Sequence, residues 1–160
     1  MNRVKRSVLL TYMGAMTMIT PGIVNAANHK IAFVNLDIPS DYHMVSSRQQ
    51  EIPSPIPGAK ATIESYAIFH SDKKGDIHLF VWQGDLPRDL GPMKSTASWP
   101  VKVDGIECEM AETSIFMGLE QKVAALFCPV DDRGRLMLYS PELSADDIRE
   151  LLANISIERH

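Results

Sequence analysis

The stretch IECEMAETSIFMGLEQKVAALFCPVDDRGRLMLYS, residues 106–140, indicates three consecutive antiparallel strands. Apolar and polar residues alternate in its first part, so that Ile106, Cys108 and Met110 would share one face of a strand. Short polar turns separate this run from two further apolar runs, which is typical of a β-meander. The predicted strands are residues 106–117, 122–130 and 135–140.

A helix is expected directly after the meander, over residues 144–155. Ser144 is a suitable N-cap, and the acidic residues Asp146 and Asp147 would lie in the first turn, where the helix dipole favours negative charge. Apolar residues then recur at the spacing of one helix face, at Ile148, Leu151, Leu152 and Ile155. The helix must bury this stripe, and the sheet offers the surface for it.

The residues before the meander supply further strand candidates between turn signals, at 30–38, 42–47, 61–70, 77–82 and 100–105. The polar turn SDKKGD, between 61–70 and 77–82, predicts a β-hairpin. Glycine and proline are frequent from 83 to 100, so we expect a long surface crossing there.

Together these elements predict an α+β fold. We expect an antiparallel sheet of about five to seven strands, with the C-terminal helix packed on one face. The chain from residue 27 to 160 has the length of a single domain, and its apolar content of 45% is sufficient for a core.

The N-terminus, MNRVKRSVLLTYMGAMTMITPGIVNAANHK, has the order of a secretory signal peptide. A basic cluster precedes an apolar run that is shorter than the about 20 residues a membrane helix needs, and small residues surround a cleavage site after Ala26. We expect residues 1–26 to be removed, leaving a periplasmic or secreted protein without stable membrane insertion. The alternative is an uncleaved N-terminal anchor.

The charge of the expected mature chain argues against two kinds of partner. The leader contains three of the 16 basic residues and none of the 20 acidic ones, so residues 27–160 carry 13 basic and 20 acidic residues, a formal charge of −7. Nucleic-acid binding requires a basic surface, and attraction to anionic lipid requires the same. We therefore expect neither partner.

Cys108 and Cys128 are the two cysteines of the chain. An exported protein meets an oxidising compartment, and the two residues lie on consecutive predicted strands, so we predict a structural disulfide. Free or reactive thiols and a metal site are the alternatives; zinc sites usually need closely spaced ligand pairs, which this sequence lacks.

The register of the predicted hairpin conflicts with that bridge. If Met117 pairs with Lys122, Cys128 lies opposite Ala111 and not opposite Cys108. A disulfide tolerates only Cα separations of about 4.4–6.8 Å. The bridge therefore requires a different loop, a bulge or an off-register geometry, and we predict an irregularity, such as a β-bulge, between residues 108 and 121.

The sequence indicates no catalytic residues, metal site or cofactor, because it contains none of the common catalytic or phosphate-binding motifs. His70 and His78 flank the hairpin turn, and pairing of His70 with Ile77 would place the two rings on opposite faces. The acidic residues could form carboxylate pairs for acid–base chemistry, but their positions are also those of a solvated surface. They are Asp72, Asp76, Asp85, Glu107, Glu109 and Glu112.

Trp82 and Trp99 are the candidate partner-binding residues, since tryptophans near loops often anchor protein–protein contacts. The alternative is that both rings cover the core.

The leading functional hypothesis is a non-catalytic envelope protein that binds an unidentified protein, as an accessory to an envelope or secretion complex or as an immunity or inhibitor protein. The alternatives are a carrier of a small molecule or lipid, and a hydrolase whose site is dispersed along the sequence.

Overall fold

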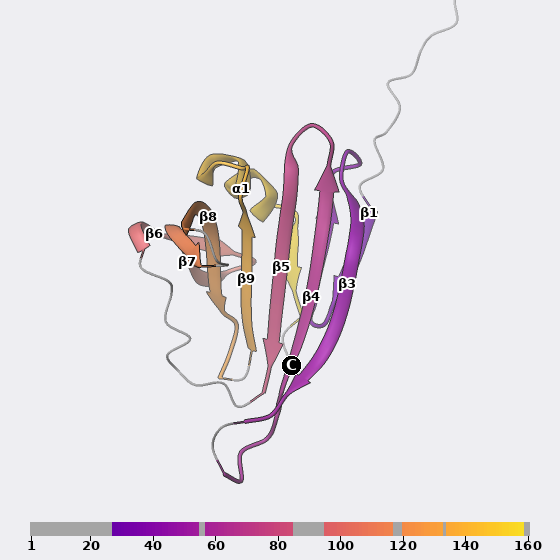
Figure 1. Ribbon diagram of the computed structural model, residues 1–160, viewed down its shortest axis with the longest axis vertical. Coiled ribbons are helices and arrows are strands. Elements are labelled where there is room, and N and C mark those ends of the chain that lie inside the picture. The colour runs from indigo at the N-terminus through magenta and orange to yellow at the C-terminus, as the bar shows by residue number, and fades with distance from the viewer. Residues whose placement is uncertain (1–26, 55–56, 85–94, 117–119, 133, 159–160) are drawn as a thin grey trace, which may run out of the picture.

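Two antiparallel sheets and one short helix make up the described chain (Figure 1). The computed structural model describes residues 27–54, 57–84, 95–116, 120–132 and 134–158. The larger sheet has seven strands in the order β3-β4-β5-β9-β8-β7-β6. These strands are β3 (His43–Ile52), β4 (Thr62–Ser71), β5 (Gly75–Gln83), β6 (Ser95–Val103), β7 (Ile106–Phe116), β8 (Glu120–Pro129) and β9 (Gly134–Ser140).

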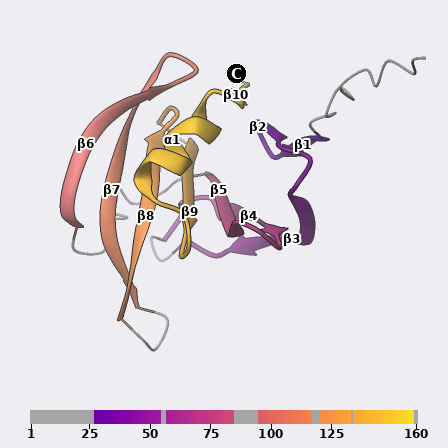
Figure 2. The ribbon, with the colours of Figure 1, turned by 90° about the horizontal axis from the view of Figure 1, so that it is seen from above.

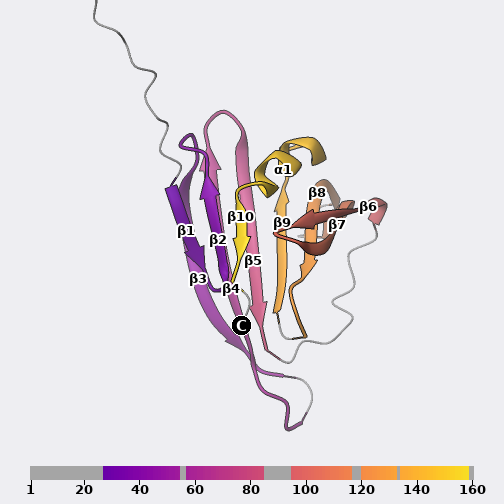
Figure 3. The same ribbon diagram turned by 180° about the vertical axis from the view of Figure 1, so that it is seen from behind.

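The smaller sheet has three strands in the order β1-β2-β10, which brings the first and last described strands together. The strands are β1 (Ala27–Ile31), β2 (Val34–Ile38) and β10 (Ile155–Ile157), and the helix α1 spans Ala145–Leu152. Seen from above, the seven strands follow an arc with α1 and the smaller sheet on its inner side (Figure 2). Figure 3 shows β1, β2 and β10 in front of the larger sheet.

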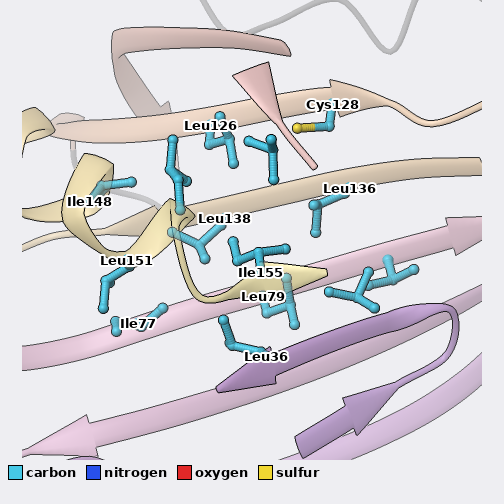
Figure 4. Close-up of a cluster of buried hydrophobic side chains, with 14 of the residues drawn as sticks. Leu36, Ile77, Leu79, Leu126, Cys128, Leu136, Leu138, Ile148, Leu151 and Ile155 are labelled. Atoms are coloured by element: carbon cyan, nitrogen blue, oxygen red, sulfur yellow. The ribbon is translucent and has the colours of Figure 1, made fainter. Parts of the chain in front are cut away.

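The main core lies between the larger sheet and the elements on its inner side (Figure 4). Most strands contribute alternate residues, because successive side chains point to opposite faces, whereas all ten residues of β3 are exposed. The helix contributes Ile148, Leu151 and Leu152, all buried. The largest fully buried side chains of the core are Phe69, Leu36, Ile38, Ile77, Leu79, Met110, Leu126, Leu136, Leu138, Ile148, Val34 and Val81. The predicted packing of the helix on one face of an antiparallel sheet is confirmed, while the second sheet was not predicted.

The predicted strand 30–38 is in fact a hairpin. Ala32 and Phe33 form its two-residue turn, and Ile31 pairs with Val34. Ala32 has a φ of 53°, as such tight hairpin turns require. An unbroken apolar run gave no turn signal here, since neither residue of the turn is a glycine, asparagine or aspartate.

Strand β6 occupies part of the segment 83–100 that was predicted to be a surface crossing. It begins at Ser95 and contains both Trp99 and Pro100. Proline is tolerated because β6 is an edge strand that pairs only with β7. The nitrogen of Pro100, which has no hydrogen to donate, can therefore face away from the sheet. Residues 85–94 lie outside the described residues.

The predicted disulfide between Cys108 and Cys128 is confirmed, with the Cα atoms 4.4 Å apart. The predicted bulge in β7 or β8 is wrong. Strand β7 pairs with β8 without a register shift, from Phe116 opposite Glu120 to Glu109 opposite Phe127, so the next position brings the cysteines together. The error came from the assumed loop, because the strands pair in a register different from that of a Met117–Lys122 pair.

The helix begins as predicted and ends three residues early. Ser144 accepts a hydrogen bond from the backbone of Asp147, whose carboxylate accepts one from the backbone of Ser144, forming a capping box. Ile155 was predicted on the helix but begins β10, where it pairs with Leu36 of β2. Pairing with the smaller sheet therefore overrides the helical spacing of Ile155. No helix in the described residues has the length and apolar character needed to span a membrane.

Candidate protein-binding face

The face of the larger sheet that points away from α1 carries a contiguous group of aromatic and apolar residues, of which Tyr139 is buried and the others are partly exposed. Cross-strand partners share a face, so the register defines rows that run across the strands. The central row contains Arg48, Tyr66, Phe80, Met137, Phe127 and Glu109. It is apolar in the middle, with a cation on β3 at one end and, toward the other end, an anion on β7 that pairs with Pro100 of the edge strand β6.

The two neighbouring rows extend this apolar area. On one side lies the row Ser46, Ile68, His78, Tyr139, Ala125 and Ala111. On the other lies the row Gln50, Glu64, Trp82, Arg135 and Pro129. We use the name outer aromatic face for Tyr66, Phe80, Trp82, Phe127, Met137 and Tyr139. In the described part of the chain, α1 and the smaller sheet both lie on the opposite face (Figures 2 and 3).

Ring contacts hold the outer aromatic face in a defined arrangement. The ring centroids of Tyr66 and Phe80 are 4.3 Å apart, and those of Phe80 and Trp82 are 5.5 Å apart with nearly parallel planes. The guanidinium carbon of Arg48 lies 5.1 Å from the centroid of the Tyr66 ring, within the range of a cation–π interaction. These contacts link Arg48, Tyr66, Phe80 and Trp82 across three neighbouring strands.

Trp82 lies on the outer aromatic face with its polar atom already satisfied. Its indole Nε1–H donates to Glu64 Oε2 at 2.8 Å, while Glu64 Oε1 accepts from the side-chain amide of Gln50 at 2.7 Å. The ring is partly exposed. The hydrogen bonds fix its position and satisfy its polar atom, while part of its apolar surface remains exposed.

Trp99 lies on the other face of the sheet. It pairs with Met110, a fully buried core residue, and packs against the core from the edge strand β6. Its indole nitrogen is buried and has no hydrogen-bond partner. The structure therefore separates the two tryptophans, and Trp99 takes the core-covering position that the sequence left open as an alternative.

The two hairpin histidines lie on the same face, contrary to the prediction. The turn is shorter than expected and consists of Asp72, Lys73 and Lys74, so His70 pairs with Asp76 instead of Ile77. Gly75, with a φ of 83°, closes this turn. The observed pairing of β4 with β5 differs by one residue from the predicted pairing. This difference places His70 on the same face of the sheet as His78.

The histidines nevertheless form separate groups. His70 Nδ1 lies 2.6 Å from an Asp76 carboxylate oxygen, and its Nε2 lies 3.2 Å from Asp72. The hydrogen bond to Asp76 raises the pKa of His70. His78 Nδ1 lies 2.8 Å from the Tyr66 hydroxyl, and burial lowers the pKa of His78.

The remaining predicted acidic positions do not join these groups. Glu109 lies toward one end of the central row, and Glu107 faces Lys102 of β6, with their charged atoms 3.7 Å apart. Glu112 is exposed, and Asp85 lies outside the described residues. Among the residues that the structure describes, no group of three or more histidine, cysteine, aspartate or glutamate side chains could hold a metal ion.

Two open clefts lie away from the outer aromatic face. One, of about 380 Å³, is bordered by apolar residues that include Phe33 of the β1–β2 turn, Ala61, Ile63 of β4 and Val130. The other, of about 510 Å³, lies between β6 and α1 and is lined by Val101, Lys102 and Leu152 among others. Neither cleft includes His70 or His78 in its lining.

Comparison of the chain with protein-family models, with curated proteins and with solved structures finds no match.

The outer aromatic face had a sequence signal that was missed. In strands β4 and β5 the segments YAIF, residues 66–69, and HLFVW, residues 78–82, are apolar or aromatic at both alternate sets of positions. A strand with one solvated face normally alternates between apolar and polar residues, whereas continuous runs are typical of strands covered on both faces. These two segments therefore indicated that the outer face is not an ordinary solvated surface.

Proposed function

We propose that this protein acts outside the cytoplasm by binding another protein through the outer aromatic face, without catalysis. The observation that carries the proposal is the central row, in which Tyr66, Phe80, Met137 and Phe127 follow one another across four neighbouring strands. All four are partly exposed on the face away from the helix.

The composition of this face is that of an interface centre. Aromatic residues, methionine and arginine are enriched in protein–protein interfaces, and charged residues concentrate at their rims. Here Arg48 and Glu109 lie on either side of the apolar part of the central row, while Glu64 and Arg135 flank Trp82. A partner that covers the rings and pairs with the flanking charges would satisfy both parts of the surface.

The proposed location is supported by the signal-peptide pattern of residues 1–26 and by the disulfide, which forms in oxidising compartments. Intact-mass analysis of protein purified from the envelope tests it. We expect the mass of residues 27–160, less two hydrogens. A retained N-terminus together with two alkylatable thiols would contradict export and cleavage.

Partner capture tests the binding face. Immobilised protein is incubated with envelope extract, and the retained proteins are compared between the wild type, Trp82→Ala and Met137→Glu. Because both substitutions alter the centre of the face, we expect at least about a tenfold loss of one stoichiometric partner. Ile63→Ala is the matched control, since Ile63 is a 40% exposed apolar residue that lies beside this region on the opposite face.

Melting temperature and an intact disulfide show that each variant remains folded. Equal capture by the wild type and both face variants would exclude the outer aromatic face as the binding site. Loss of capture in Ile63→Ala alone would place the contact at the cleft that Ile63 lines.

The cleft of about 380 Å³ favours a second candidate function, transport of a small molecule. Its volume is within the range of about 300–1,000 Å³ found for ligand pockets. Phe33, Ile63 and Val130 supply apolar walls, with Lys60 and Glu158 at the border. Native mass spectrometry of freshly purified protein would show a co-purified ligand, and Ile63→Trp should remove it by filling the cleft.

A further inference from the structure

The two edges of the larger sheet differ in how they meet solvent. Edge strands expose unpaired backbone groups, and proteins commonly block them with proline, lysine or irregular pairing. Strand β6 has all three features, namely Pro100, Lys102 and a register shift between Ser95 and Ala97. This edge is therefore protected against the addition of another strand.

Strand β3, at the opposite edge, lacks such protection over most of its length. All ten of its residues are exposed, and it contains neither proline nor lysine. Its one irregularity lies near its start, between Met44 and Ser46, and the pairing with β4 is regular from Ser46 to Ile52. This seven-residue segment presents an uninterrupted backbone edge, seen at the side of the sheet in Figure 1.

We propose that β3 pairs antiparallel with β3 of a second copy of this chain. A two-fold axis perpendicular to the sheet, through Gln49, would join two seven-stranded sheets into one continuous sheet. Such an axis keeps each face of the sheet on its own side. The outer aromatic faces of the two copies therefore become parts of one larger surface.

The length of the regular segment selects this register. Pairing all residues from Ser46 to Ile52 with their copies requires the axis at the midpoint, which is Gln49. A two-fold axis at a residue also pairs each side chain with one from the same face, as an antiparallel sheet requires. A shift of the axis to Arg48 or Gln50 shortens the ladder within the regular segment.

The charges of β3 fit the same register. Gln49 meets Gln49 of the second copy, Arg48 meets Gln50, and Ser47 meets Glu51. No like charges are directly opposed, and each charged side chain faces an uncharged hydrogen-bonding group. An axis at Arg48 would instead place two guanidinium groups opposite each other, which destabilises a strand pair.

These charges also favour a copy of this chain over an unrelated strand. Arg48 and Glu51 give β3 no net charge, although residues 27–160 have a formal charge of −7. Two copies can therefore approach along β3 without the repulsion that most of their surfaces would produce. A pair of seven-residue strand segments buries less surface than a standard protein–protein interface. We therefore expect the dimer to dissociate on dilution, with a dissociation constant on the order of micromolar.

Sedimentation equilibrium of the exported, oxidised protein provides the first test. We expect a reversible monomer–dimer equilibrium over a concentration series that spans the micromolar range. The backbone amides of β3 should exchange with deuterium more slowly at high concentration, while those of β6 should not change. A monomer at every concentration, or a dimer without protection in β3, would overturn the proposal.

Cysteine cross-linking tests the register. In the proposed dimer the two Gln49 Cα atoms directly oppose each other at about 4.5–5.5 Å, within the range that a disulfide accepts. Under mild oxidation Gln49→Cys should form a covalent dimer. Gln50→Cys and Ser98→Cys are matched controls, because residue 50 opposes residue 48 in this register and Ser98 is an exposed residue of β6.

Several outcomes of cross-linking would count against the dimer. Equal cross-linking of all three variants would indicate random collision, and preferential cross-linking of Ser98→Cys would indicate an interface at the other edge. Protection of β3 amides only when envelope extract is added would indicate a foreign strand as the occupant. Because these readouts need no partner protein, failure of the dimer leaves the proposed function of the outer aromatic face independently testable.

Discussion

His70 and His78 lie on one face of the same hairpin, yet their surroundings shift their pKa values in opposite directions. The hydrogen bond to Asp76 stabilises the imidazolium of His70 and raises its pKa. Burial in the row beside Tyr139 disfavours the charged form of His78 and lowers its pKa. Sequence alone could not show this, since a single residue of register decides which groups each ring meets.

Replacing Asp76 with asparagine should lower the pKa of His70 toward the ordinary value of 6.5. The substitution removes the charge that the imidazolium contacts at 2.6 Å. NMR titration of the histidine ring protons measures the shift. Asp72→Asn is the control and should have the smaller effect, because Asp72 is 3.2 Å away and almost fully exposed.

The raised pKa of His70 also predicts the pH dependence of stability. The contribution of the His70–Asp76 contact is fully present below the unfolded pKa of 6.5 and is lost as the pH rises through the higher folded pKa. For His78 the sign is reversed, so protonation of the unfolded chain reduces stability as the pH falls through 6.5. The difference in urea midpoint between wild type and Asp76→Asn should therefore be larger at about pH 6 than at about pH 9. A constant difference would contradict this linkage.

At the level of elements, local sequence signals predicted the start of α1 correctly and its end incorrectly. The side chain of Ser144 and the two acidic residues after it are local features that can be recognised in a sequence. The end of the helix depends on β2, which lies more than a hundred residues earlier and captures Ile155 as a strand residue. Tertiary pairing of this kind has no local signature.

Ser144→Ala should lower the free energy of unfolding by about 1 kcal/mol. The substitution removes the acceptor for the backbone N–H of Asp147 and the hydroxyl that donates to its carboxylate at 2.6 Å. Urea unfolding measures the change. Asp146→Ala, which breaks an exposed pair with Arg149, is the control and should change stability by less than about 0.5 kcal/mol. Equal effects of the two substitutions would show that the capping box contributes nothing specific.

The disulfide clamps β7 to β8 at the end of their ladder that lies away from the connecting turn. It joins Cys108 and Cys128, which are separated by 20 positions in the sequence. Reduction should therefore lower the free energy of unfolding by roughly 3 kcal/mol in the chain-entropy description. Urea unfolding with and without a phosphine reductant measures the loss. The double variant Cys108→Ala/Cys128→Ala should be less stable than the oxidised protein and insensitive to the reductant. Retention of full stability after reduction would contradict a structural role.

For the whole molecule, the sequence predicted the class of fold but not its division into two sheets. The meander and the hairpin were visible because their strands are consecutive and their turns are polar. The smaller sheet joins β1, β2 and β10, which come from opposite ends of the chain. The continuous apolar runs of β4 and β5 signalled the outer aromatic face only in part, because its assembly depends on the order in which β4, β5, β9 and β8 are placed side by side.

The last strand closes the fold. Ile155 and Ile157 of β10 are buried, and Ser156 between them is exposed. Backbone hydrogen bonds anchor the ends of this segment, from Asp37 N–H to the Asn154 carbonyl and from Glu158 N–H to the Phe33 carbonyl. Strand β10 therefore connects the helix to the smaller sheet.

Ending the chain after residue 153 should destabilise the whole molecule, although only its last seven residues are removed. Burial of the two isoleucines contributes about 1.5–3 kcal/mol for each side chain, and β2 would lose one of its two neighbours. Because domains of this kind are stable by only about 5–15 kcal/mol, we expect a large fall in the urea midpoint and lower recovery of folded protein. Ser156→Ala, which alters the exposed position of the same strand, should leave the midpoint unchanged. If the shortened chain unfolds at the wild-type urea concentration, the smaller sheet does not contribute to closure of the core, and β1 and β2 pack without support from β10.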